Sequence, residues 1–252
     1  MPADRGPGDD PPTGWRHGPP GPLAPIDPDA PVGGHRLPAP RSSGAASSPE
    51  HDWNAARAVL FPTLRPAGTA GVSLVTLNRY HLAAEGRRDH ASPLLDEGPA
   101  GILVAYALGM SGYDVLVSPD HLLAWGIDAE MLRGAALANL AAWSRTAPWM
   151  DEVDGGHRIR SSDTGDGFDA ARILLPEVRE ELVRTLALAR GSRVLVAIPE
   201  QHLLVAASVA PGDDEFGEQF AAFAAAAAAE AESPIASRPL ELHPDGIRFA
   251  GA

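Results

Sequence analysis

Apolar segments of strand length occur in pairs in this chain, and that arrangement limits the folds it can adopt. Residues 101–108 and 113–117 form one pair, and residues 194–198 and 203–207 form another. Longer segments between and after the pairs have apolar residues every three or four positions, as in amphipathic helices. Strands joined by short connections pair antiparallel, whereas parallel strands need a crossover. We therefore predict an α+β fold, with a largely antiparallel sheet and helices packed on one face.

Capping residues and turn residues place the remaining elements. Ser118 and Pro119 begin a short helix that Gly126 ends, and Asp128 begins a second helix. Further helices are expected from Trp53 to Leu60 before Pro62, from Pro176 to Gly191, and from Asp213 or Asp214 to Ala229. Additional strands are expected at Val72–Leu77 and in a hairpin at Leu240–Phe249. Residues 78–98 are predicted to form a loop or weak helix, and residues 151–169 a loop with a short edge strand at Arg158–Arg160.

The first 50 residues differ from the rest in composition. They contain 13 Pro and 8 Gly, so they cannot bury enough apolar surface to offset the entropy of ordering. We predict a disordered Pro/Gly-rich leader at residues 1–50, followed by one α+β domain at residues 51–252. Pro19–Pro22 could engage a module that binds proline-rich segments, although a plain leader is favoured.

Composition and charge exclude several classes of function. The chain has no Cys, and all 20 of its Lys and Arg residues are Arg. A disulfide framework, a thiolate metal site and a Schiff-base lysine are therefore excluded. The net charge of −13 argues against a nucleic-acid partner, which needs a basic surface. We expect no membrane span, because no apolar run reaches about 18 residues, and we expect no secretory signal.

The segment from Asp151 to Arg172 carries six acidic residues and is the sharpest candidate for chemistry. Carboxylates together with an imidazole suit divalent cations. The candidate metal ligands are Asp163, Asp166, Asp169 and His157. The calcium-loop pattern does not fit, because its first and last ligands would be Ser162 and Ile173. We therefore favour a solvated loop in which Asp169 caps a helix beginning at Ala170, with the metal site as the alternative.

Arg172 follows Asp169 by three residues on one predicted helix face. If both are exposed, they form an ordinary ion pair that contributes about 0.3–0.5 kcal/mol. If both are buried, they could instead recognise a carboxylate or phosphate of a ligand. The candidate ligand-binding residues are Asp166, Asp169, Arg172, Glu200 and His202. A relaxed dinucleotide fingerprint at Gly165–Ala170 is set aside, because no apolar strand precedes it.

Three segments occur in an order and spacing that resemble a known family. They are Val117-Ser-Pro-Asp-His-Leu-Leu-Ala-Trp-Gly-Ile127, Asp166-Gly-Phe-Asp-Ala-Ala-Arg-Ile-Leu-Leu175 and Val196-Ala-Ile-Pro-Glu-Gln-His-Leu-Leu204. Together they make residues 55–250 similar to the YtpQ family of bacterial proteins, also called DUF1444 or UPF0354. Members of that family tend to carry an Arg-Asp pair where this chain has Gln201-His202, and a structured segment where it has the Pro/Gly leader. The resemblance implies a fold rather than an activity or a ligand.

These observations favour a cytoplasmic, non-enzymatic domain. We predict that it binds a protein partner or a small ligand through the Gly/Asp loop and the hairpin tip at Pro199–His202, without a cofactor. The alternative is a metal-dependent hydrolase or transferase that uses the acidic loop from Asp163 to Asp169 and His157. A third possibility is a scaffold whose proline-rich leader recruits a partner. The sequence leaves the oligomeric state open.

Overall fold

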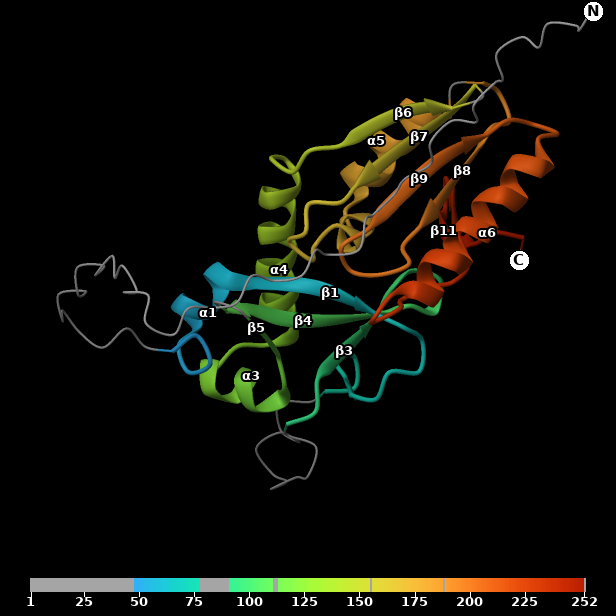
Figure 1. Ribbon diagram of the computed structural model, residues 1–252. Coiled ribbons are helices and arrows are strands. Elements are labelled where there is room, and N and C mark those ends of the chain that lie inside the picture. Colours follow the sequence, from blue (N-terminus) through green and yellow to red (C-terminus); the bar gives the residue numbers. More distant parts are fainter. Residues whose placement is uncertain (1–47, 78–90, 111–112, 155, 188, 252) are drawn as a thin grey trace, which may run out of the picture. The chain divides into compact units, whose positions relative to one another are not determined.

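The computed structural model describes residues 48–77, 91–110, 113–154, 156–187 and 189–251. All of them belong to one unit that spans residues 46–252. Among these residues the chain forms five α-helices, two 3-10 helices and eleven strands in two sheets (Figure 1). The predicted α+β class with largely antiparallel pairing is therefore confirmed. The predicted disordered leader lies outside the described residues up to residue 47, and the loop or weak helix predicted at residues 78–98 lies outside them up to residue 90. The last part of that loop prediction is wrong, because Leu94–Glu97 form a strand of the first sheet.

The first sheet is built around one buried central strand. Its strands are β1 (Leu60–Arg65), β2 (Val72–Ser73), β3 (Leu94–Glu97), β4 (Leu103–Met110) and β5 (Tyr113–Leu116). Their order is β1-β4-β3-β2, and β5 pairs with β4 beyond β3 on the same side. The predicted helix ends before Pro62, but Pro62 itself lies within β1. Because β1 is an edge strand, a proline without an N–H is tolerated there.

The second sheet is entirely antiparallel. Its strands are β6 (Met150–Asp154), β7 (His157–Ser162), β8 (Arg193–Ala197), β9 (Leu204–Val209), β10 (Leu240–His243) and β11 (Gly246–Phe249). Their order is β11-β10-β8-β9-β7-β6. The loop predicted at residues 151–169 is therefore wrong in its first half, which is the β6–β7 hairpin. The short strand predicted at Arg158–Arg160 lies within β7, but β7 is an inner strand between β9 and β6 and not an edge strand. The polar strands of this hairpin lack the apolar alternation that marks a strand in sequence, although Asp-Gly-Gly is a typical hairpin connection.

Helices cover both sheets. They are α1 (Trp53–Val59), α3 (Pro119–Trp125), α4 (Ala129–Ser144), α5 (Pro176–Leu186) and α6 (Asp214–Glu230), with the 3-10 helices η1 (Pro99–Gly101) and η2 (Ala170–Leu174). In β8, Val194 and Val196 face the main core with Leu182 of α5, whereas Leu195 faces Phe220 of α6. The second sheet thus carries α5 and α6 on opposite faces, so the predicted packing of helices on one face does not hold for this sheet. Every helix of the described residues is too short or too polar to cross a lipid bilayer.

Two predicted element boundaries are wrong. The strand expected at Val72–Leu77 is limited to Val72–Ser73, because after Ser73 the chain turns and the Thr76 hydroxyl donates a hydrogen bond to the Ser73 carbonyl. The helix expected to end at Gly191 ends at Leu186. Gly191 instead lies in the turn before β8 with a φ of +84°, a conformation that favours glycine.

The start of α3 contains a histidine that must be neutral. The backbone N–H of Ser118 donates to Nδ1 of His121 at 3.0 Å, and the Ser118 hydroxyl lies 2.9 Å from the same nitrogen. A protonated Nδ1 could not accept these bonds. Burial lowers the pKa of His121, against the nearby carboxylates of Glu50 and Asp120, which raise it. Ser118 and His121 form the capping box of α3, in which each side chain accepts from the backbone of the other residue, and Ser118 is only 4% exposed.

We expect His121→Gln to reduce the loss of stability in acid. Because the folded-state pKa is lowered, the unfolded chain binds the proton more readily, and stability falls as the pH drops below the unfolded value of about 6.5. Glutamine keeps an acceptor for Ser118 but does not titrate. Urea unfolding at pH 7.5 and pH 5 should show a smaller loss for His121→Gln than for the wild type. His202→Gln, at an exposed position, is the control, and identical losses in all three proteins would contradict the explanation.

Candidate functional site

The structure brings together the two predicted parts of the site, the Gly/Asp loop (residues 163–172) and the hairpin tip (residues 199–202). The backbone N–H of Ala170 donates to the Gln201 carbonyl at 3.1 Å. Gly165 and Gly167 have φ values of +77° and +80°, which ordinary side chains rarely adopt. A Cβ at Gly167 would meet the His202 ring at 3.5 Å, so the loop lies directly against the tip.

Phe168 anchors the loop to the first sheet and to α4. Its ring stacks on Phe61 of β1 with centroids 4.0 Å apart, and it meets the edge of Trp143 at 5.5 Å. The indole N–H of Trp143 donates to the Asp166 carboxylate at 3.0 Å. The Asp166 side chain remains exposed, although the loop around it is held by the Phe168 ring and by the hydrogen bond from Trp143.

Asp169 does not cap η2 through its side chain, so the capping role predicted for it is wrong. Its carboxylate is 0% exposed and points back to the end of β7. The Ser162 hydroxyl donates to Oδ1 at 2.5 Å, and the Thr164 hydroxyl donates to Oδ2 at 2.8 Å. A buried carboxylate is costly unless hydrogen bonds satisfy it, and these two hydroxyls do so.

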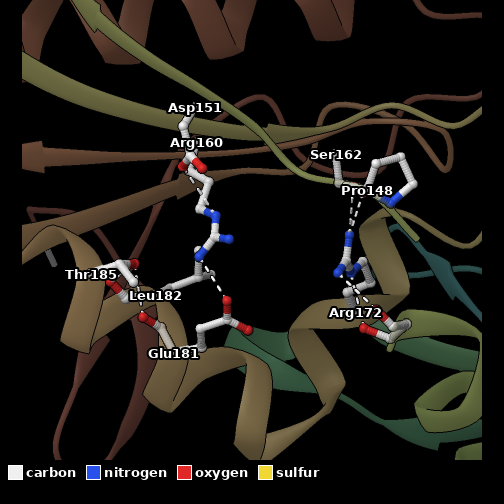
Figure 2. Close-up of polar contacts among 9 residues, drawn as sticks. Pro148, Asp151, Arg160, Ser162, Arg172, Glu181, Leu182 and Thr185 are labelled. Atoms are coloured by element: carbon white, nitrogen blue, oxygen red, sulfur yellow. Dashed lines mark hydrogen bonds and ion pairs between the residues drawn. The ribbon is translucent and has the colours of Figure 1, made fainter. Parts of the chain in front are cut away.

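Arg172 is the largest fully buried side chain described, with 1% exposure. Its Nη1 donates to the Ser162 hydroxyl at 2.7 Å and, more weakly, to the Pro148 carbonyl at 3.4 Å. Its Nε and Nη2 donate to the hydroxyl and the carbonyl of Ser144 at 3.0 and 3.1 Å. Figure 2 shows the side chain reaching from η2 toward Ser162 and Pro148. Ser162 therefore bridges the two buried charges, accepting from Arg172 and donating to Asp169.

Trp149 lies against the guanidinium groups of both Arg172 and Arg160, at 3.7 and 4.8 Å from the ring centroid. Arg160 itself joins Glu181 of α5 at 2.8 Å and approaches Asp151 of β6 at 3.2 Å (Figure 2). The second contact is only electrostatic, since Nε of Arg160 makes no well-aligned hydrogen bond. Burial lowers the pKa of Arg172 to about 10, against the raising effect of Asp169 and Glu181, so the side chain stays charged at neutral pH.

This geometry gives Arg172 an internal role. Its N–H groups are occupied by Ser144, Pro148 and Ser162, and a ligand at the surface does not reach them in this conformation. Ligand binding by Arg172 and Asp169 stays a prediction. Of the other predicted binding residues, Asp166 and His202 are exposed and Glu200 is half-buried. These three residues thus place two carboxylates and one imidazole at or near the surface of the loop and the tip.

The four residues of the metal alternative are not gathered. Asp163 and Asp166 are exposed, and Asp169 is bonded to hydroxyl groups below the surface. His157 lies 2.6 Å from Asp213 at the start of α6 and stacks on Phe216 at 3.7 Å. The hydrogen bond with His157 lowers the pKa of Asp213. Within the described part of the chain, no three His, Cys, Asp or Glu residues form a group that could hold a metal ion.

A second polar cluster, which no sequence pattern predicts, lies between the first sheet and α4. Arg133 donates through Nε and Nη2 to the two oxygens of Asp96, at 2.5 and 2.8 Å, and the Tyr106 hydroxyl donates to Asp96 at 2.8 Å. Burial raises the pKa of Tyr106. These side chains line a cavity of 340 Å³ together with Leu137 and Leu174. No spacing in the sequence links its members, because they come from three separate elements.

Comparison of the chain with models of protein families, with curated proteins and with solved structures found no match. The resemblance to the YtpQ family therefore stays a prediction.

We expect Ser162→Ala to destabilise the fold by about 2 kcal/mol, because it leaves two buried charged groups without a shared partner. The matched control is Ser161→Ala, whose half-buried side chain points to the other face of β7. The control should change the free energy of unfolding by less than about 0.5 kcal/mol. Urea unfolding followed by tryptophan fluorescence measures both. Equal effects of the two substitutions would show that the Ser162 hydroxyl does not hold the loop.

Proposed function

We propose that the domain binds a positively charged protein partner, or a small cationic ligand, through the outer side of the Gly/Asp loop and the hairpin tip. One observation carries this proposal. The Asp169–Ser162–Arg172 network is buried and holds the loop from below, while Asp163 and Asp166 stay exposed above it. Binding surfaces gain affinity when they are ordered before the partner arrives.

The hydrogen bonds of the polar side chains support a role in binding rather than in catalysis. Ser162, Asp169 and Arg172 are bonded to one another beneath the surface, so they are not positioned to act on a substrate. The hydroxyl–imidazole pair of Ser118 and His121 is used to cap α3. The exposed groups of the loop, in contrast, are carboxylates, which recognise cations and hydrogen-bond donors.

The proposal also covers the class of partner and the location. We propose that nucleic acid is not a partner, since the chain carries a net charge of −13. We propose a cytoplasmic location, where a chain without cysteine needs no oxidising environment. Membership of the YtpQ family is part of the same proposal and rests on the three sequence segments alone.

The test compares two triple variants that lose the same number of charges. One is Asp163→Asn, Asp166→Asn and Glu200→Gln at the loop and tip. The control is Glu218→Gln, Glu230→Gln and Glu232→Gln, all exposed and outside the site. The probe is a fluorescent peptide in which four Arg alternate with Gly, measured by anisotropy at low salt.

We expect the loop and tip variant to bind the Gly/Arg peptide about tenfold more weakly than the wild type, because it loses three ion pairs with the peptide, two at exposed and one at a half-buried carboxylate, that contribute roughly 0.2–1 kcal/mol each. The control variant should stay within about twofold of the wild type. Equal weakening in both variants would mean that binding follows the net charge and not this surface, and the proposal would fail.

A further inference from the structure

Strand β6 has an outer edge with which no strand of the described residues pairs. It is the last strand of the second sheet and pairs only with β7 (Figure 1). Its residues Met150, Asp151, Glu152 and Val153 are all exposed, so neither α5 nor α6 covers this strand. A strand in this position presents unpaired N–H and C=O groups to any extended segment that approaches.

The register identifies the backbone groups that face outward. Asp154 pairs with His157, and two residues separate them, so this pair closes the hairpin with mutual hydrogen bonds. Hydrogen-bonded and non-hydrogen-bonded pairs then alternate along the ladder. Met150 and Glu152 therefore bond to β7, whereas Asp151 and Val153 direct their N–H and C=O groups away from it.

The side chains of β6 define the chemistry of an added strand. Met150 is 56% exposed and Val153 is 70% exposed, and between them lie the acidic residues Asp151 and Glu152. Cross-strand neighbours are stabilised when apolar residues meet and when opposite charges meet. The complement of this sequence is apolar, basic, basic, apolar, and it reads the same in either strand direction. A second copy of β6 would place acid against acid, which disfavours self-pairing.

We propose that β6 receives an extended segment of a protein partner, with the pattern apolar-basic-basic-apolar, as a seventh strand of the second sheet. This inference rests on the proposed function and specifies its partner. The two surfaces are continuous, because Met150 pairs with Ser161 and the Gly/Asp loop begins immediately after Ser162. A bound strand would thus run from the exposed edge toward the carboxylates of the loop.

The competing explanation is a protected edge. Charged residues on an edge strand deter aggregation without binding anything. Asp151 already lies 3.2 Å from Arg160, although its side chain is 71% exposed. The two explanations predict different use of the backbone, because only an added strand would bond to the N–H of Val153.

The experiment uses the full chain and the peptide Thr-Val-Arg-Arg-Val-Thr, blocked at both ends, in calorimetric titrations. Val153→Pro removes an N–H that β7 does not use, and proline is tolerated on edge strands. Val153→Thr is the matched control, since it keeps the N–H and a β-branched side chain. We expect Val153→Pro to weaken binding about tenfold or more, and Val153→Thr to weaken it less than about threefold.

Two modified peptides give a second measurement that does not depend on the folding of a variant. Each is N-methylated at one of the two alternating sets of amides. Strand addition predicts that wild-type protein binds only the peptide whose free amides face β6. Equal binding of both methylated peptides, equal binding by Val153→Pro and wild type, or no binding of the unmodified peptide would each overturn strand addition.

The same titrations separate this inference from the proposed function. If the loop and tip variant loses the peptide and Val153→Pro keeps it, the acidic surface binds but strand addition is wrong. If Val153→Pro loses the peptide and the loop and tip variant keeps it, β6 is the docking site and the proposed surface fails.

Discussion

The guanidinium group of Arg172 lies almost completely out of solvent and is bonded to three other parts of the chain. These are the end of α4 at Ser144, the connection at Pro148 and the end of β7 at Ser162. Removing a charge from water costs several kcal/mol unless hydrogen bonds and an opposite charge replace the solvent. Here the Ser162 hydroxyl is bonded to both the guanidinium and the Asp169 carboxylate, and the Trp149 ring packs against the guanidinium. The position of the Gly/Asp loop depends on this network, because Asp169 and Arg172 are both residues of the loop.

The buried network orders the loop, and the exposed carboxylates of the loop form the proposed binding surface. Buried charges held by several hydrogen bonds favour one arrangement of the backbone, since other arrangements leave a charge unsatisfied. The loop above them therefore holds Asp163 and Asp166 in fixed places, next to the tip with Glu200 and His202. The exposed strand β6 continues this surface, because Met150 at its start pairs with Ser161, just before the loop. A partner would meet an acidic edge that is already ordered.

The elements that could be predicted from the sequence are those with a strong local signal. The β4–β5 and β8–β9 pairs, the caps at Ser118 and Asp128 and the final hairpin follow from apolar runs and turn residues. The β6–β7 hairpin was missed, apart from a short strand at Arg158–Arg160, because its polar strands resemble a loop. The partners of Arg172 could not be predicted, since Ser144 lies 28 residues away and only tertiary packing brings it near. The resemblance to a family directed attention to Asp169 and Arg172, but not to their burial.

The most direct test of the central claim is a double-mutant cycle between Asp169 and Arg172. The free energy of unfolding is measured for Asp169→Asn, Arg172→Met, the double variant and the wild type. A second cycle pairs Arg172→Met with Asp163→Asn, which lies next to the network but is exposed. We expect a favourable coupling of about 1–3 kcal/mol in the first cycle and less than about 0.5 kcal/mol in the second. Equal coupling in both cycles would mean that Ser162 does not connect the two charges energetically, and that packing alone positions the loop.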